Sequence, residues 1–394
     1  MPQVVPEFAK AGLAVLAGYG IKRLGWVTED DGKALAKLLI NVLIPSLLVV
    51  TFWTQNQKNG TPIPVLETFV QPAICVGWAC LLGLLPGWLF FGLRARNDRV
   101  KGVTPRYAPD RLGMTIACSL GWNIGMFGFP IIQQLFGAEG FKYIALFDIG
   151  NVILTYGVSY YVVVVYAPGE SQFDCKRVLV RIFSARPLQA AFIGMIMSLT
   201  GLPVWQFAAD WLEFVGKSNA PISLLILGVY LDFSKWRLQN AVHCMQVLVI
   251  RFAPSVLVFT GIALFRPKLL VNVEEVVTLL CFLMPCGLIV IPYSLEFGYD
   301  VHFVSMLVNV SMVASLILMT VALVVITAVQ DRQGNVNFAG AWWIVLLVIG
   351  GLGGIAAAAV AFTNRRLQSS TPRRPVSDQG LELKTPFTQH EVKV

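Results

Sequence analysis

Long runs of apolar residues, each close to the length of a membrane-spanning helix, dominate this sequence. A helix needs about 20 predominantly apolar residues to cross the roughly 30 Å hydrocarbon core of a bilayer. Only 13% of the 394 residues are charged, about half the share found in a soluble domain. We therefore expect an all-α polytopic membrane protein. The eleven predicted helices cover approximately 4–21, 34–54, 69–93, 111–136, 140–166, 187–203, 206–232, 240–265, 273–297, 301–328 and 340–362.

Basic residues gather in alternate loops between these predicted helices. The loop after the third helix alone carries Arg94, Arg96, Arg99, Lys101, Arg106 and Arg111. All loops on the opposite side together hold only Lys58, Lys142, Arg266, Lys268 and Arg332. By the positive-inside rule the N-terminus lies outside and the C-terminus in the cytoplasm. The net charge of +8 therefore indicates contact with anionic membrane lipid and not with nucleic acid. We expect the plasma membrane in preference to the endoplasmic reticulum, although the short central loop is compatible with either.

Two pairs of helix-breaking motifs recur five helices apart. Asn41–Pro45 in the second helix matches Asn219–Pro221 in the seventh, and Gly121–Pro130 in the fourth matches Met284–Pro292 in the ninth. Halves with an odd number of helices must lie in opposite orientations, which is the design of many secondary transporters. Close packing of small residues could account for the glycines, but it does not account for prolines at matching places. We therefore expect broken helices.

The alignment of these motifs sets the expected division of the chain. When Pro130 is aligned with Pro292, Gly137 falls within one residue of Gly298. The expected segments are a first inverted repeat of five helices (1–166), a short cytoplasmic loop (167–186), a second inverted repeat of five helices (187–328), an extra transmembrane helix (340–362) and a disordered cytoplasmic tail (363–394).

Several motifs together resemble the auxin efflux carrier family, which includes bacterial carboxylate carriers. They are Asn123-x-Gly-x-x-Gly-x-Pro130 with Gly137 and Asn151, Pro221 with Gly228, Arg251-Phe252, and Pro285-Cys-Gly287 with Glu296-Phe-Gly-Tyr-Asp300-Val. The likeness covers about 30–330. It implies a 5+5 inverted-repeat fold, shared with bile-acid and sodium–proton transporters, in which broken helices four and nine cross. It also implies an elevator mechanism, in which a transport domain carries an organic anion past a scaffold of helices one, two, six and seven.

Two features depart from the plant members of that family. Some of those proteins carry an Asp and a Lys in the third helix that look coupled to protonation, whereas this helix, Val70–Leu93, has no charge. The loop between helices five and six is also short. The expected substrate is therefore a small organic anion, either auxin-like or another carboxylate.

The predicted substrate site lies where the two broken helices cross. The N-terminal ends of half-helices carry partial positive charge and free N–H groups, so they can hold a carboxylate. We expect the substrate to contact Asn123, Gly125 and Pro130 from one half. From the other half we expect Pro285, Gly287 and Leu288. The Asn123 side chain has an alternative role, which is to cap its own half-helix.

Charged residues inside predicted spans are candidates for ion coupling, because each is expensive in hydrocarbon. Asp148 is mid-span and close to Asn151, and Asn309 lies near the matching place in the second half. Asp148 could bind a proton, share a cation site with the two asparagines, or pair with Arg251. Arg251 could instead neutralise the substrate. We predict no metal site and no cofactor, and coupling to H⁺ or Na⁺ is left open.

Enzyme activity is not expected, because the spans offer neither a nucleophile–base pair nor a metal cluster. The alternative function is a membrane ligand sensor that uses the transporter fold without net transport. Gly350–Gly354 in the eleventh helix contains a small-xxx-small spacing. That spacing allows a homodimer, docking on the scaffold, or no specific contact.

Overall fold

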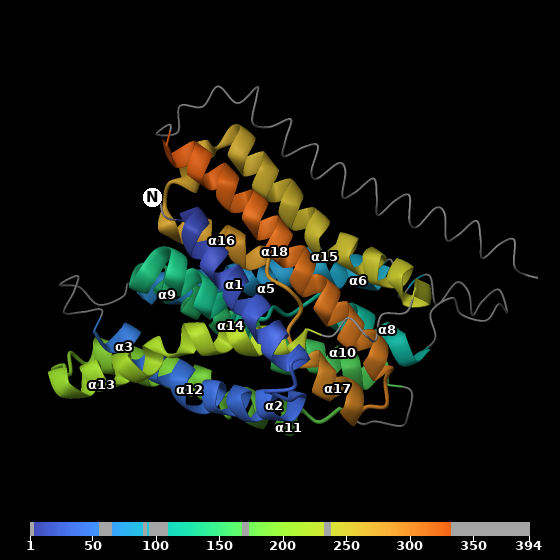
Figure 1. Cartoon of the computed structure of the whole chain (residues 1–394), viewed down its shortest axis with the longest axis horizontal. Helices are drawn as coiled ribbons and strands as arrows, with labels where there is room; N and C mark the ends of the chain where they lie inside the picture. Colours follow the sequence, from blue (N-terminus) through green and yellow to red (C-terminus); the bar gives the residue numbers. More distant parts are fainter. Residues whose placement is uncertain are drawn as a thin grey trace, which may run out of the picture.

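The protein is a bundle of long helices, seen here in a computed structural model (Figure 1). The structure describes residues 4–54, 65–89, 93, 109–167, 173–231 and 238–331, and within these ranges it contains no β-strand. Six helices there are long and apolar enough to cross a membrane, and a bent pair raises the number to seven. The prediction of an all-α polytopic membrane protein is therefore confirmed. The predicted eleventh helix and the tail lie outside the described residues.

The first half of the chain contains α1 (Val4–Arg23) and three of the six long apolar helices. Helix α1 forms the first helical segment. The second comprises α2 (Glu29–Leu38), a π-helical segment η1 (Leu39–Leu43) and α3 (Ile44–Trp53). The third comprises α5 (Val65–Trp78), π segment η2 (Ala79–Leu84) and α6 (Leu85–Gly87). After α8 (Pro109–Ala117), the remainder comprises π segment η4 (Ile124–Gly128), α9 (Phe129–Ile153), π segment η5 (Leu154–Ser159) and α10 (Tyr160–Val165).

The remaining elements lie in the second half of the chain. It comprises α11 (Cys175–Phe183), α12 (Arg186–Leu199), α13 (Gln206–Lys217), α14 (Asn219–Tyr230), α15 (Leu238–Phe265), the 3-10 turn η6 (Pro267–Leu270), α16 (Val273–Phe282), α17 (Val290–Glu296) and α18 (Val301–Asp331). Helix α11 falls inside the segment that we expected to be a loop. It meets α12 at a bend of 59°.

The second membrane helix begins earlier than its apolar run predicts. The Thr28 hydroxyl accepts a hydrogen bond from the Asp31 N–H at 3.2 Å, and the Asp31 carboxylate accepts one from the Thr28 N–H at 2.9 Å. This reciprocal capping box satisfies two N–H groups that would otherwise lack partners. Helix α2 therefore starts at Glu29, among acidic residues that favour a helix N-terminus. Because these residues are not apolar, the apolar run does not reveal this start.

Helices one, two, six and seven pack in two equivalent pairs. Helix α1 packs on α14, and α3 packs on α12. The first pair is in backbone contact, because a Cβ atom at Gly18 would overlap the carbonyl oxygen of Leu225, and one at Gly228 would overlap that of Val15. Small residues allow membrane helices to approach this closely. Each of the two pairs joins one helix from the first half of the chain to one from the second.

Helices four and nine are both interrupted, and the interruptions meet. Helix four stops at the end of α8 and resumes at Ile124. Helix nine stops at the end of α16 and resumes at Val290. Between these ends Trp122 and Cys286 form an antiparallel bridge. Helix-disfavouring residues occupy both gaps, Asn123 in the first and Pro285 in the second, which explains why the spans unwind there.

In helices four and nine, the part that follows the interruption ends in a sharp glycine turn. Gly137 has φ +61° and ψ −148°, and Gly298 has φ +72°. Backbone conformations with positive φ are accessible to glycine at little cost. The two turns lie at nearly matching places in the repeat alignment. The fourth and fifth predicted helices therefore share one element, α9, which bends at Gly137.

Candidate functional site

A cavity of about 400 Å³ opens beside the helix crossing. Its walls come from η1, both unwound segments, the second part of α9, η5 and the bend between α11 and α12. The lining residues are Ile40, Asn41, Ile44, Trp122, Asn123, Ile124, Gly125, Met126, Asp148, Asn151, Val152, Thr155, Tyr156, Arg181, Ser184, Ala185, Arg186, Pro187, Gly287, Leu288 and Ile289. Both predicted groups of residues, for substrate and for coupling, contribute to this one cavity.

Asn123 lines the cavity and carries a buried hydrogen-bond donor without a partner among the described residues. Its backbone is engaged, since the N–H donates to Pro285 O at 2.9 Å and the carbonyl accepts from the Gly128 N–H at 3.1 Å. Its side chain is different: the residue is 5% exposed, and Nδ2 has no hydrogen-bond partner among the described residues. Asn123 is the N-cap residue of η4, but its side chain makes no capping bond. A buried donor without a partner is costly, so a ligand that accepts a hydrogen bond is favoured here.

The start of η4 adds backbone donors to the same wall. The first N–H groups of a helix have no partner within the helix and carry partial positive charge. Ile124, Gly125 and Met126 all line the cavity, and η4 runs directly into α9 without a break in helical backbone. The combination of a free amide and a helix N-terminus suits an anion.

Asp148 and Asn151 form a hydrogen-bonded group with the first unwound segment. Asn151 Nδ2 donates to Asp148 Oδ1 at 2.9 Å and to the carbonyl of Trp122 at 3.1 Å. Asn151 Oδ1 accepts from the Trp122 N–H at 2.9 Å and from the Thr155 hydroxyl at 3.3 Å. Asn151 thus ties α9 to the residue that precedes Asn123. Asp148 is the acidic residue among those lining the cavity.

Helix α18 holds the second unwound segment in a similar way. Ser311 Oγ accepts from the Cys286 N–H at 3.1 Å, and the Ser315 hydroxyl donates to Leu283 O at 2.5 Å. Asn309, predicted to share a cation site, is 5% exposed on the same helix but does not line the cavity. The second half thus uses two serines where the first half uses one asparagine, a substitution that the sequence pattern did not reveal.

Arg251 lies behind the crossing and not in the cavity wall. Its guanidinium donates to Cys118 O at 2.8 Å, Gly121 O at 2.9 Å, and Met284 O and Pro285 O at 3.0 Å each. Within the described part of the chain it forms no ion pair with Asp148. The two roles that we considered for Arg251, partner of Asp148 and neutraliser of substrate, are therefore not the ones that its contacts indicate.

The remaining predicted substrate residues separate into two groups. Gly287 and Leu288 line the cavity, opposite Asn123. Pro130 is buried in the first turn of α9, and Pro285 offers its carbonyl to the Asn123 N–H. The two prolines therefore shape the crossing, while the other residues face the cavity.

Two arginines at the bend between α11 and α12 were missed by sequence reasoning. Arg181 donates to Glu296 Oε1 at 2.7 Å and lies 4.4 Å from the centre of the Tyr160 ring. Arg186 donates to Gln189 Oε1 at 3.0 Å. Both line the cavity. The alternation of basic and apolar residues in Cys175–Phe183 was the available signal for this short amphipathic helix.

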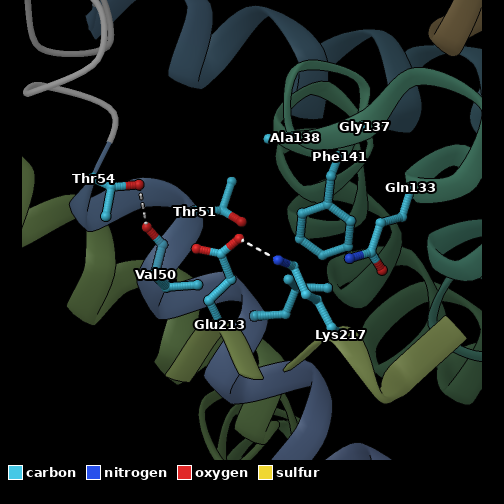
Figure 2. Close-up of a pocket in the computed structure, with 10 residues that line it drawn as sticks. Val50, Thr51, Thr54, Gln133, Gly137, Ala138, Phe141, Glu213 and Lys217 are labelled. Carbon is cyan, nitrogen blue, oxygen red and sulfur yellow. Dashed lines mark hydrogen bonds and ion pairs between the residues drawn. The ribbon is translucent and has the colours of Figure 1, made fainter. Parts of the chain in front are cut away.

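A second cavity of about 250 Å³ lies between α3, α9 and α13, and none of the predicted site residues lines it. Figure 2 shows its lining, with Lys217 reaching the Glu213 carboxylate across 2.9 Å. Gly137 and Phe141 of α9 form one of its walls. The two charged groups of this cavity, Lys217 and Glu213, pair with each other. This cavity is therefore a weaker candidate for an ion site than the first cavity.

The fold and the first cavity define a class: a polytopic α-helical membrane protein with two interrupted helices that cross beside a polar cavity. No protein-family model matches the chain. The chain is similar to an uncharacterized transporter of Methanothermobacter thermautotrophicus, with 26% identity over 303 residues that cover 77% of this chain and 92% of that protein. It is also similar to an uncharacterized transporter of Methanocaldococcus jannaschii, with 24% identity over 226 residues that cover 56% of this chain and 66% of that protein.

Proposed function

We propose that the protein is a secondary transporter that carries a small organic anion, auxin-like or another carboxylate, by an elevator mechanism. The observation that carries this proposal is the buried, unpartnered Nδ2 of Asn123, a residue that lines the cavity and stands at the start of a half-helix. The names of the two archaeal relatives support transport. The motif resemblance supports membership of the auxin efflux carrier family.

In this proposal the carboxylate accepts hydrogen bonds from Asn123 Nδ2 and from N–H groups at the start of η4. The apolar body of the substrate lies against Ile44, Ile124 and Leu288 in the cavity wall. A cavity of about 400 Å³ is within the range of small-molecule sites. Arg181 and Arg186 at the rim raise the local concentration of anions.

The elevator motion would move the crossing past α1, α3, α12 and α14, and two of these helices, α3 and α12, supply part of the cavity wall. In this proposal the protein lies in the plasma membrane and the arginine-lined rim faces the cytoplasm, the orientation that the positive-inside rule predicts. Asp148 is the proposed coupling group, because Asn151 joins it to the backbone beside Asn123. Binding of a proton at Asp148 would therefore alter the geometry at the anion site.

The test is uptake of radiolabelled carboxylates, including indole-3-acetate, into proteoliposomes that contain the purified full chain. Loss of one hydrogen bond to a charged group costs about 1.5–3 kcal/mol, so Asn123→Ala should weaken binding by roughly 10–100-fold. Asn41→Ala is the matched control, because Asn41 lines the same cavity but its Nδ2 already donates to Lys37 O at 2.7 Å. It should keep most of the flux.

Two outcomes would contradict this proposal. Equal flux in Asn123→Ala and wild-type protein would show that the anion does not bind at the crossing. Saturable binding of a carboxylate with no flux under any ion gradient would instead identify a ligand sensor, which is the alternative function for this fold.

A further inference from the structure

Four backbone carbonyl oxygens converge on the guanidinium of Arg251. Two of them, from Cys118 and Gly121, follow the first half of helix four, and two, from Met284 and Pro285, follow the first half of helix nine. All four distances lie between 2.8 and 3.0 Å. Each inverted repeat thus contributes an equal share to one polar cage, and α15 of the second repeat supplies the cation that fills it.

The cage has the chemistry of an ion site. The last carbonyl groups of a helix have no partner within the helix and carry partial negative charge. Here α8 and α16 both end at the cage. Convergent carbonyl oxygens without a full negative charge are the ligands that metal cations accept in membrane proteins. A bare cage of this kind at the midplane of a transporter would bind a monovalent cation.

Arg251 occupies this cage as a permanent cation. The residue is 5% exposed, and none of its contacts with the described residues is to a carboxylate. The rings of Trp122 and Phe252 also lie beside it, each centred 5.7 Å from the guanidinium carbon. The positive charge is therefore balanced by backbone dipoles and aromatic faces, which is how a bound metal cation would be balanced.

We propose that Arg251 is a tethered cation that replaces a coupling metal ion at the crossing of helices four and nine. Its head closes the cage in every state of the protein, so the crossing assembles without Na⁺ or K⁺. Pro285 O accepts from both Arg251 and the Asn123 N–H, so Arg251 also acts as a positioning residue for the anion site. This inference stands independently of the proposed substrate, because it concerns the assembly of the empty site.

The test is thermal unfolding of the purified full chain in detergent, without substrate, in NaCl, KCl or choline chloride at equal ionic strength. The Tm of the wild-type protein should be the same in all three salts. Arg251→Ala should lower Tm by roughly 5–10 °C, and Na⁺ or millimolar guanidinium should restore roughly half of that loss with saturation. Arg111→Ala is the control, because Arg111 pairs with the carboxylate of Asp300 at 2.6 Å and not with a carbonyl cage. It should show no difference between Na⁺ and choline.

A second pair of variants decides the matter if Arg251→Ala does not fold. Arg251→Lys keeps a charge in the cage and should remain insensitive to Na⁺. Arg251→Gln removes the charge but keeps a donor, and its Tm should become dependent on Na⁺. Equal insensitivity of both variants would overturn the proposal. So would a Tm increase in Na⁺ that is the same in wild-type protein and Arg251→Ala.

Discussion

The N–H of Asn123 donates to the carbonyl oxygen of Pro285 across 2.9 Å, so one hydrogen bond joins the interruptions of helices four and nine. The residue that makes this bond also lines the cavity, and its side-chain Nδ2 has no partner among the described residues. A change of backbone position at Asn123 would therefore affect both the crossing and the cavity wall.

Replacement of Asn151 should loosen the first unwound segment. Asn151→Ala removes the hydrogen bonds to both backbone groups of Trp122 and to Asp148. At about 0.5–1.5 kcal/mol for each bond, the expected loss of unfolding free energy is about 2–4 kcal/mol, measured by thermal unfolding in detergent. Thr155→Val is the control, since it removes one bond of 3.3 Å and should cost about 1 kcal/mol or less. Equal effects of the two variants would contradict the role assigned to Asn151.

Asp148→Asn should uncouple transport from the proton gradient. The variant keeps the shape of the side chain and the contact with Asn151, but it cannot change its charge. We expect wild-type uptake to respond to an imposed pH gradient and to a protonophore, and uptake by the variant to respond to neither. Substrate affinity at a single pH should be retained within about tenfold. A variant whose uptake still follows the pH gradient would place the coupling group elsewhere.

The backbone contact between α1 and α14 should make two glycines of one helix behave in opposite ways. Gly18→Ala places a methyl group on the carbonyl oxygen of Leu225, whereas Gly20→Ala meets nothing within 4 Å. Overpacking costs typically about 1–3 kcal/mol, so Gly18→Ala should lower Tm. Gly20→Ala should raise unfolding free energy by up to about 1 kcal/mol, because alanine loses less backbone entropy in a helix. The same change in both variants would be inconsistent with the contact.

The rim arginine should act on anion binding through its charge. Arg181→Gln should raise the KM for uptake by roughly threefold at low salt, and the difference from wild type should shrink as added salt screens the charge. Glu296→Gln should have the opposite effect, since it releases Arg181 from a partly exposed ion pair of 2.7 Å. Such pairs contribute at most about 1 kcal/mol to stability, so neither variant should lower Tm much. A salt-independent change in KM would indicate altered packing instead.

The interruptions were the most predictable part of the fold, because Asn123 and Pro285 disfavour helix in any setting. The turns at Gly137 and Gly298 were also predictable, because glycine is the residue that adopts positive φ at little cost. The start of helix two was not, because the hydrogen bonds between Thr28 and Asp31 extend the helix beyond its apolar run. The assignment of the chain to two repeats stays a prediction.

The partners of buried polar groups were the least predictable part of the site. Arg251 was considered as a partner of Asp148 or as a neutraliser of the substrate, yet its guanidinium donates to four carbonyl oxygens from two distant segments. Only the crossing brings these oxygens together, and no spacing along the chain encodes that. Arg181 was missed because α11 is shorter than a membrane helix and carries basic residues among apolar ones. In both cases the chemistry depends on long-range contacts.

The two-sided engagement of Asn151 has a thermodynamic consequence. One face of its amide holds Asp148, and the other holds the backbone immediately before Asn123. If a proton at Asp148 changes the affinity for the anion by some factor, the bound anion must change the affinity of Asp148 for the proton by the same factor. The direction of coupling, symport or exchange, is then fixed by whether that factor is above or below one, and a single titration of proton release on anion binding would measure it.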